Sequence, residues 1–366
     1  MTLARGLLRQ LWFRGLIAAA LVAGMVTLFV RRGPDWNSVY HAFDFVVWRW
    51  IVLAVLINLL SVIVRSIAWD LVVRQALTPP FPRFPLVFSA FCVGLLGNAA
   101  LPARAGEIAR VAVLRRRLPH GSGTTAVLLG TVFAHRLFDL FPVVSLIVYT
   151  LFTAKIPHWA ISAIVLFVGV GFALLCFALV TARRQHTRVL DEMGAARRLL
   201  AMAQRGLWVL KRPRAAAGAT VFQFLGWFLQ LLAVYTVMRA FGFGTLPAAA
   251  LVLLLMNVAT IFPLWPGNVG LMQAAIALPL VSYGVDYGTG FAYGLALQAV
   301  EMSVGVGLGL AFLAREGISF AVLKGIRDER EDDGPSGEIV LADLDPPTEE
   351  AAVEPEDEPA RAASRR

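Results

Sequence analysis

The sequence has few charged residues for its length: Asp, Glu, Lys and Arg together make up 16% of its 366 residues. Hydrophobic residues account for 58%, and the mean hydropathy is +0.71. A soluble domain needs more polar surface than this composition supplies. The composition therefore excludes a soluble globular protein and predicts that most of the chain lies in lipid.

Cysteines and the usual motifs of enzymes are also scarce. The two cysteines, Cys92 and Cys176, both lie in apolar runs without a metal-binding pattern, which favours buried structural thiols. The sequence has no zinc-protease, nucleophile-elbow or phosphate-loop motif. We therefore expect no enzymatic activity, no metal, no cofactor and no nucleic-acid partner.

Acidic residues are rare until the last part of the chain. Residues 1–326 contain 28 Lys and Arg but only 10 Asp and Glu, whereas residues 327–366 contain 14 Asp and Glu and 5 Arg. Basic loops beside a membrane indicate its cytoplasmic side. The acidic, Pro- and Ala-rich tail is typical of disorder. We expect a transmembrane domain over residues 1–314 and a disordered cytoplasmic tail over residues 315–366.

Six apolar runs are interpreted as spanning helices, since a crossing takes about 20 residues at 1.5 Å per residue. They are Leu16–Val30, Phe45–Val64, Thr124–Phe152, Trp159–Ala182, Ala215–Ala240 and Gly288–Leu313. The first run is not followed by a small-residue cleavage site, so we expect it to be retained. The arginine-rich segments predict a multi-pass protein of the plasma membrane with both termini in the cytoplasm.

Two further apolar stretches are interrupted by proline. Phe84–Leu101 precedes a dense arginine cluster that would face outward if this run crossed, so we expect a re-entrant hairpin broken at Pro102. Leu246–Pro263 and Leu271–Tyr283 predict a second hairpin that enters from the opposite face. Hairpins from opposite faces are typical of inverted-repeat transporters, whose binding site lies between the breaks. The predicted fold is an all-α polytopic membrane protein with about six spans, two broken hairpins and an inverted repeat inferred from topology.

The stretch from Asn98 to Arg110 places charges at membrane depth. Such charges cost several kcal/mol unless they face protein, water or a charged ligand. Glu107 lies three residues from both Arg104 and Arg110, so on a helix it can contact each of them. The pattern fits either an Arg–Glu–Arg lattice that stabilises the hairpin or a site where a lipid phosphate takes the free arginine donors.

Further charges lie within the expected spans. Arg136 and Asp139 are three residues apart and are expected to pair, either as a clamp between helices or in a transport path. Glu301 has no cation near it in sequence. We expect it to pair with Arg136 or Arg104 across the bundle, or to carry a proton if it stays unpaired. Arg65 is expected near the interface, with its head group in water.

Three motifs resemble, in this order, those of the lysylphosphatidylglycerol synthase transmembrane-region family, also called flippase-like or uncharacterised protein family 0104. They are Asn98-x-x-Leu101-Pro102-x-Arg104-x-Gly106-Glu107-x-x-Arg110, Arg136-x-x-Asp139 and Pro263-x-x-Pro266-Gly267-x-x-Gly270. The resemblance covers roughly residues 10–315. It implies an integral membrane protein, and some members form the flippase half of a lipid-aminoacylating enzyme.

The chain departs from this family pattern in three places. Many members carry Glu at the position of His135 and near Gln273. Only a short tail follows Arg315 where aminoacylating members have a synthase domain, so we do not expect lysyl transfer.

The leading hypothesis is a translocase of an anionic lipid or lipid-linked intermediate. The expected phosphate-binding residues are Arg104, Glu107, Arg110, Arg136 and Asp139. The expected hairpin breaks are formed by Asn98, Pro102, Gly106, Pro263, Pro266, Gly267 and Gly270, with Glu301 as the proton or pairing site.

Two alternatives remain at this point. The protein is a non-transporting accessory or regulator of a lipid or cell-envelope enzyme, with purely structural charges, or a polytopic polyprenyl-phosphate transferase. The transferase would need a carboxylate pair in an outer loop, whereas Asp35, Asp44 and Asp286 are scattered. Membrane lipids are the expected partners in all three cases.

Overall fold

The computed structural model describes residues 34–77, 79–100, 106–118, 124–156, 212–260 and 268–315. Every regular element within these segments is helical, which confirms the predicted all-α class. The elements are α2 (Trp36–Asp44), α3 (Trp48–Ala76), α4 (Phe84–Ala100), α5 (Gly106–Arg116), α6 (Thr124–Thr153), α9 (Pro213–Ala240), α10 (Leu246–Ala259), α11 (Leu271–Leu280), the 3-10 helix η4 (Val281–Tyr283) and α12 (Tyr287–Arg315).

Among the described residues, four helices, α3, α6, α9 and α12, are long and apolar enough to cross a membrane. They match four of the six predicted spans, so the chain is a multi-pass membrane protein. The other two predicted spans, Leu16–Val30 and Trp159–Ala182, lie outside the described residues, as does the acidic tail from residue 316.

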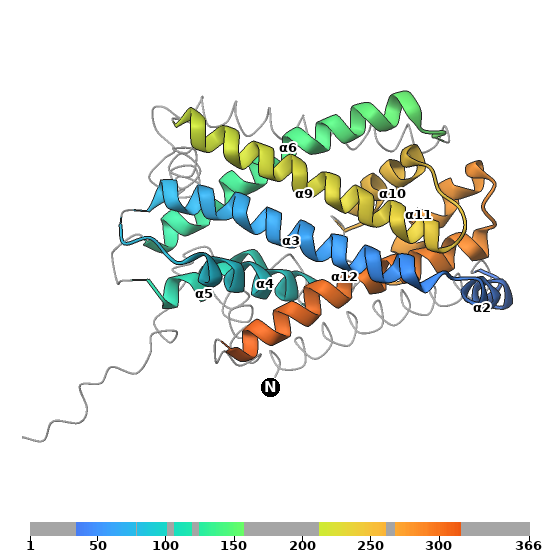
Figure 1. Ribbon diagram of the computed structural model, residues 1–366, viewed down its shortest axis with the longest axis horizontal. Coiled ribbons are helices and arrows are strands. Elements are labelled where there is room, and N and C mark those ends of the chain that lie inside the picture. Colours follow the sequence, from blue (N-terminus) through green and yellow to red (C-terminus); the bar gives the residue numbers. More distant parts are fainter. Residues whose placement is uncertain are drawn as a thin grey trace, which may run out of the picture.

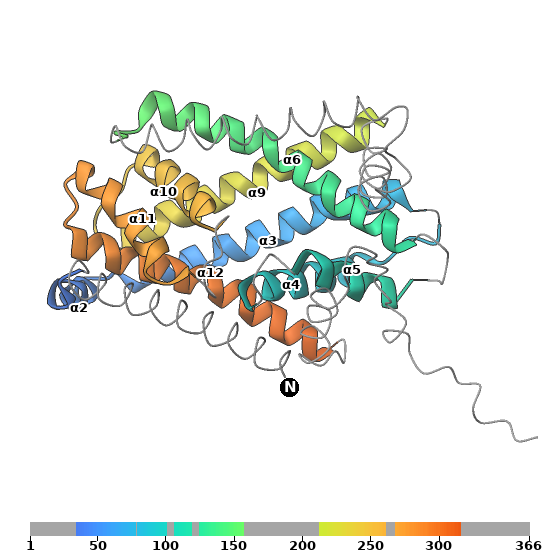
Figure 2. The ribbon, with the colours of Figure 1, turned by 180° about the vertical axis from the view of Figure 1, so that it is seen from behind.

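Helices α3 and α9 form an antiparallel pair that runs the length of the bundle (Figure 1). At one end the amide of Val47 donates to the carbonyl of Ala240 at 2.9 Å. Further along, the hydroxyl of Ser61 donates to the carbonyl of Gly226 at 2.8 Å. Helix α6 packs against both partners and crosses them in the view from behind (Figure 2). Polar side chains on these three helices are therefore brought together.

The first predicted hairpin appears as the short helices α4 and α5, which are packed closely as antiparallel arms. A Cβ atom on Gly97 would lie 2.7 Å from Cα of Gly106, and one on Gly94 would lie 3.1 Å from Cβ of Arg110. A Cβ atom on Gly106 would overlap the carbonyl oxygen of Gly94. Small residues at a helix contact let the backbones approach, as membrane helices require for tight packing.

The second predicted hairpin appears as α10 and α11, and its tip is held by polar backbone contacts. The side chain of Asn268 donates to the carbonyl of Ala259 at 2.9 Å, which ties the start of one arm to the end of the other. Gly270 has φ of 93°, a conformation that needs glycine. The side chain of Gln273 accepts from the amide of Gly270 at 2.6 Å. Gly270 is thus explained by the geometry of the helix start.

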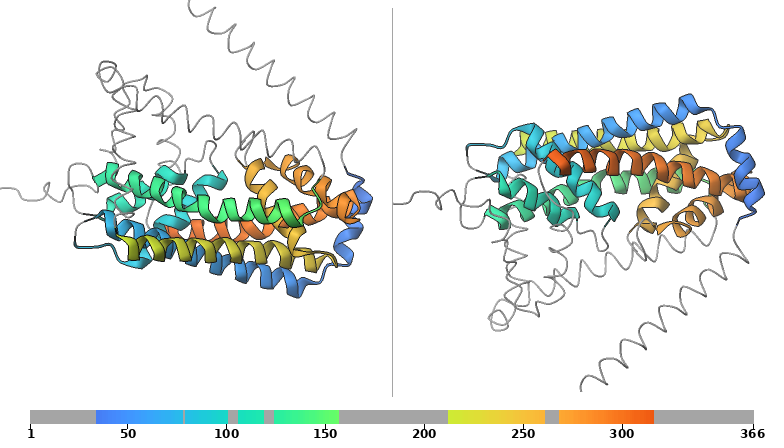
Figure 3. Two further views of the ribbon diagram at one scale, coloured as in Figure 1. Left: turned by 90° about the horizontal axis from the view of Figure 1, so that it is seen from above. Right: turned by 90° about the horizontal axis from the view of Figure 1, so that it is seen from below.

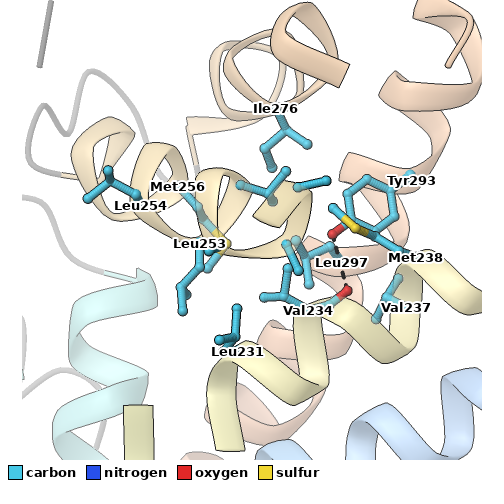
Figure 4. Packing of buried hydrophobic residues seen from close by; sticks show 14 of the residues in the cluster. Leu231, Val234, Val237, Met238, Leu253, Leu254, Met256, Ile276, Tyr293 and Leu297 are labelled. Atoms are coloured by element: carbon cyan, nitrogen blue, oxygen red, sulfur yellow. Dashed lines mark hydrogen bonds between the residues drawn. The ribbon is translucent and has the colours of Figure 1, made fainter. Parts of the chain in front are cut away.

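An apolar cluster joins the second hairpin to α9 and α12 (Figure 4). Leu253 of α10, Ile276 of α11 and Tyr293 of α12 are all fully buried within it. The hydroxyl of Tyr293 donates to the carbonyl of Val234 at 3.3 Å, which satisfies the polar end of the ring. In lipid such packing stabilises the bundle through van der Waals contacts, which hold α10 and α11 against α9 and α12.

Helix α12 contacts both hairpins, the first toward its C-terminus. Phe88 of α4 meets Phe312 edge to face, with ring centroids 5.4 Å apart. Further along α4, Leu96 contacts Gly309. Residue numbers rise along α4 as they fall along α12, so α4 runs from the C-terminal end of α12 toward its middle.

The second hairpin meets the N-terminal half of the same helix. A Cβ atom on Gly290 would lie 3.1 Å from Cα of Ala277, and one on Gly294 would lie 3.2 Å from Cα of Gln273. Gln273 also donates to Gln298 at 2.5 Å. The start of α11 therefore points to the middle of α12, where Glu301 is the central residue. The two hairpins approach this level from opposite ends, as the predicted inverted repeat requires.

Helix α2 lies across one end of the bundle (Figure 3). Its first residue, Trp36, packs on Phe291 of α12 with ring centroids 6.0 Å apart. Asp35 caps the helix, and the hydrogen bond from the Ser38 hydroxyl, at 2.8 Å, lowers the pKa of Asp35. Tyr40 is 70% exposed, which suits an aromatic anchor at the membrane surface.

Candidate functional site

The charged residues of the first hairpin and of α6 meet in one cluster. In α5, Nη2 of Arg110 lies 2.7 Å from Oε2 of Glu107, the pair that their spacing predicts. The other carboxylate oxygen of Glu107 accepts a hydrogen bond from Arg136 of α6. Glu107 therefore joins two arginines from two helices.

Asp139 of α6 is the second carboxylate of the cluster, and three helices supply its partners. Arg136 donates to Oδ2 at 3.1 Å, which confirms the predicted pairing within α6. The indole of Trp227 donates to Oδ1 at 2.8 Å, and the amide of Gln223 donates to the same oxygen. Nη2 of Arg65, from α3, lies 3.7 Å from Oδ1. Three hydrogen bonds and one nearby guanidinium offset the cost of burying this carboxylate at membrane depth.

Arg65 does not lie at the interface, and that prediction was wrong. Helix α3 continues beyond the expected end of the span, to Ala76, and this places Arg65 inside the bundle. Its Nη1 donates to Oε1 of Gln230 at 3.2 Å, and its guanidinium carbon lies 5.7 Å from the ring centre of Trp227. A buried partner on α9 replaces the water that snorkelling would have supplied.

Aromatic rings enclose Arg110, which is 3% exposed. Its guanidinium carbon lies 4.7 Å from the ring centre of Trp69 and 5.8 Å from that of Phe91. Its Nε has no hydrogen-bond acceptor among the described residues. His135, also buried, packs edge to face against Phe91 at 6.0 Å. Cation–π contacts offset part of the desolvation cost and leave Nε available.

Glu301 is linked to this cluster through an amide. The side chain of Gln230 donates to Oε1 of Glu301 at 3.2 Å while its own oxygen accepts from Arg65. The expected partner Arg136 is engaged by Glu107 and Asp139 instead. A chain of polar contacts thus runs from the middle of α12 to the first hairpin.

Several residues assigned to the site lie outside the described part of the chain. They are Arg104, Pro102, Pro263, Pro266 and Gly267. Asn98 is described: its side-chain oxygen is buried, with no hydrogen-bond donor among the described residues. Gly106 and Gly270 are explained by close backbone approach and by positive φ, respectively.

Four residues that hydrogen-bond or ion-pair with the charges were not predicted from the sequence: Arg65, Gln223, Trp227 and Gln230. The last three follow an i, i+4, i+7 spacing in α9, which puts them on one face of the helix. A stripe of polar side chains along one face of an apolar span indicates that this face meets other polar groups inside the bundle. Arg65 had no such signal, because its depth depends on where α3 ends. Within the described segments, no group of three His, Cys, Asp or Glu side chains can hold a metal ion.

Comparison with known proteins identifies the family to which this architecture belongs. The model of the lysylphosphatidylglycerol synthase TM region matches residues 15–309. The chain belongs to this family. It is also 25% identical over 211 residues to a UPF0104 membrane protein of Methanocaldococcus jannaschii, a match that covers 53% of this chain and 83% of that protein. No solved structure matches the chain significantly.

The family match includes every charged residue of the cluster and both hairpins. It therefore confirms the resemblance drawn from the three motifs. As a member of this family, the chain is a multi-pass membrane protein. Its polar interior is built by α3, α5, α6, α9 and α12.

Proposed function

We propose that the protein translocates an anionic lipid or lipid-linked intermediate, with its phosphate held by the arginines of the cluster. The observation that carries this proposal is the position of the cluster. Its polar contacts extend to Glu301, at the middle of α12, the level toward which both hairpins point from opposite ends. A site between two broken hairpins at mid-membrane is where inverted-repeat transporters bind substrate.

The charge of the cluster favours an anion. Among the described residues, three arginines, Arg65, Arg110 and Arg136, pair directly with only two carboxylates, Glu107 and Asp139. The third carboxylate, Glu301, lies beyond the amide of Gln230 and pairs with none of them directly. The Nε atoms of Arg65 and Arg110 have no acceptor among those residues. A guanidinium binds phosphate through two parallel donors, so a phosphate group matches both the charge and the free donors.

We further propose that the protein lies in the plasma membrane with its arginine-rich end in the cytoplasm. The described residues at that end include Arg74, Arg83, Arg115, Arg116, Arg117, Arg212, Arg214 and Arg315. The opposite end has Arg49, Lys155 and Arg239 together with Asp35, Asp44 and Asp286. An excess of arginine marks the cytoplasmic side of membrane proteins, so this arrangement also puts the tail inside.

The test is lipid movement by the purified full-length chain in liposomes. Fluorescent phosphatidylglycerol is placed in both leaflets, and a membrane-impermeant reductant bleaches the outer one. We expect bleaching beyond half of the signal with the wild type. Glu107→Gln and Arg136→Ala should slow the movement at least tenfold, because each leaves buried charge unpaired and distorts the phosphate site.

Asp70→Asn is the matched control. Asp70 pairs with Arg74 at 2.7 Å, one turn away in the same helix, as Glu107 pairs with Arg110 at 2.7 Å. The Asp70 pair lies outside the cluster, so its loss should leave lipid movement near the wild-type rate. A wild type that moves no lipid, or cluster variants that move it normally, would refute the translocase.

The internal pairing of the cluster favours one other function. Glu107 engages two arginines from two helices, which is how a purely structural lattice would look. The protein would then be an accessory or regulator of a lipid or cell-envelope enzyme. In that case Glu107→Gln would lower the unfolding temperature, while the wild type would move no lipid in liposomes.

A further inference from the structure

We propose that Arg65 is the arginine that receives the phosphate and that Glu301 takes up a proton when the phosphate binds. This inference rests on the proposed function and adds the identity of the binding residue and the proton stoichiometry. The three described arginines of the cluster differ in how closely they are paired with carboxylates.

Arg65 is paired less closely than the other two arginines. Its nearest carboxylate oxygen, Oδ1 of Asp139, lies 3.7 Å away, whereas Arg110 lies 2.7 Å from Glu107 and Arg136 lies 3.1 Å from Asp139. That Asp139 oxygen already accepts from Trp227 and Gln223. The side chain of Arg65 is 18% exposed, which leaves it reachable by a ligand.

The stem of Arg65 is fixed while its head group keeps unused donors. Gly226 of α9 lies against the stem, and a Cβ atom there would lie 3.2 Å from Cδ of Arg65. The guanidinium rests over the ring of Trp227, and its Nε has no acceptor among the described residues. A fixed stem whose Nε is unpaired among those residues and whose Nη2 lies 3.7 Å from its carboxylate can offer two donors to a phosphate.

Glu301 is the carboxylate that such a phosphate would meet. One amide, Gln230, separates it from Arg65: the amide accepts from the guanidinium at 3.2 Å and donates to Glu301 at 3.2 Å. A phosphate that takes the donors of Arg65 would displace this amide and bring a second negative charge close to Glu301. Like charges at this depth repel strongly, because little water screens them.

Proton uptake removes that repulsion. One proton moves from hydronium or a buffer acid in the aqueous phase to the carboxylate of Glu301: the donor's bond to that proton breaks as the O–H bond of Glu301 forms. The neutral acid then donates a hydrogen bond either to Gln230 or to the phosphate. Binding of one phosphate is thereby linked to binding of one proton.

Among the described residues, the neighbours of Glu301 offer no other base for this proton. Helix α4 offers only the thiol of Cys92, and α11 has no ionisable side chain. Helix α2, with Tyr40, His41 and Asp44, lies across the end of the bundle (Figure 3). The remaining ionisable groups of α3 and α9 lie toward the ends of those helices, apart from Arg65 itself and Tyr235. On α12, Tyr293 has its hydroxyl bonded to Val234, two turns from Glu301.

The experiment measures binding of dihexanoyl phosphatidylglycerol to the full-length chain in detergent between pH 5.5 and 8.5. A phosphodiester keeps one negative charge over this range, so pH dependence reports on the protein. We expect the wild-type affinity to rise about tenfold for each pH unit lowered while Glu301 is ionised, since one proton is linked to binding. Calorimetry in buffers of different ionisation enthalpy should show uptake of one proton.

Glu301→Gln keeps an acceptor for Gln230 but cannot ionise. Its affinity should be independent of pH and, at pH 8.5, tighter than that of the wild type. Arg65→Gln should weaken binding at least tenfold at every pH. Arg65→Lys, which keeps the charge and the fold, should weaken binding less and retain the pH dependence. Asp70→Asn is the control and should behave as the wild type does.

The outcomes separate this inference from the proposed function. If phosphatidylglycerol binds and moves but Glu301→Gln keeps the wild-type pH dependence, or the Arg65 variants bind normally, this inference fails alone. If the wild type neither binds nor moves phosphatidylglycerol, the proposed function fails and this inference fails with it. Competition with inorganic phosphate tests whether the bound phosphate belongs to a lipid head group. Equal affinity for the free ion and for phosphatidylglycerol would contradict a lipid ligand.

Discussion

Gly226 of α9 lies directly against Arg65 of α3. A Cβ atom on Gly226 would overlap Cγ of Arg65 and lie 3.2 Å from its Cδ. The hydroxyl of Ser61, one turn away, donates to the Gly226 carbonyl at 2.8 Å and holds the two helices at this spacing. The absence of a side chain at one position thus sets the place of a cation in the other helix.

Gly226→Ala should therefore disturb the cluster without altering any charge. We expect a loss of about 1–3 kcal/mol in stability from overpacking and a several-fold fall in lipid movement, because Arg65 must shift. Gly218→Ala is the control on the same helix, since among the described residues its Cβ would meet only the end of Leu71, at 3.3 Å. Thermal unfolding and the liposome assay measure the two effects, and equal behaviour of both variants would contradict the expectation.

Gly106→Ala should damage the first hairpin. The new Cβ would overlap the backbone carbonyl of Gly94 and lie 2.7 Å from Oδ1 of Asn98, and backbone cannot move aside as a flexible side chain can. We expect the unfolding free energy to fall by about 3 kcal/mol, the upper part of the overpacking range. Gly307→Ala, where no atom of the described residues lies within 4 Å, should keep the wild-type unfolding midpoint.

Glu107→Gln alone and combined with Arg110→Met should differ in stability. The single change leaves buried arginine charge uncompensated and should cost about 3–5 kcal/mol, whereas removing both charges of a buried pair is often nearly neutral. The double variant should therefore recover most of the unfolding temperature. If the cluster binds substrate, lipid movement should stay low in the double variant; recovered movement would show that the pair is structural.

The orientation of the chain predicts a labelling pattern in intact cells. Arg83 and Ser282 are both exposed and lie at opposite ends of the bundle. In a Cys176→Ser background, where the remaining native thiol of Cys92 is buried, Ser282→Cys should react with a membrane-impermeant maleimide. Arg83→Cys should react only after the cells are permeabilised. The reverse pattern would place the arginine-rich end outside.

The positions of the helices were largely predictable because apolar length is itself the physical requirement for a span. The expected Gly288–Leu313 corresponds to α12 at Tyr287–Arg315, and the expected Ala215–Ala240 corresponds to α9 at Pro213–Ala240. The pair of Arg136 and Asp139 was also predictable, because spacing within one helix fixes it.

The contacts between helices were not predictable in the same way. The rotation and depth of each helix decide whether Glu107 meets Arg136. They also decide whether Gln230 lies between Arg65 and Glu301. Small residues such as Gly226 set those quantities, and their effect appears only once both helices are placed. Glycines in an apolar run show where helices approach each other, but they do not show which helix approaches.

The sharing of α12 by the two hairpins has a mechanical consequence. Gly290 and Gly294 of α12 contact α11, and Gly309 contacts α4, so both hairpins pack closely against the same helix through glycines. A sliding of α12 by one residue, about 1.5 Å, would shift its register against both hairpins at once. A movement of one hairpin along α12 would therefore be coupled to the other, and Glu301 lies between the two contact regions.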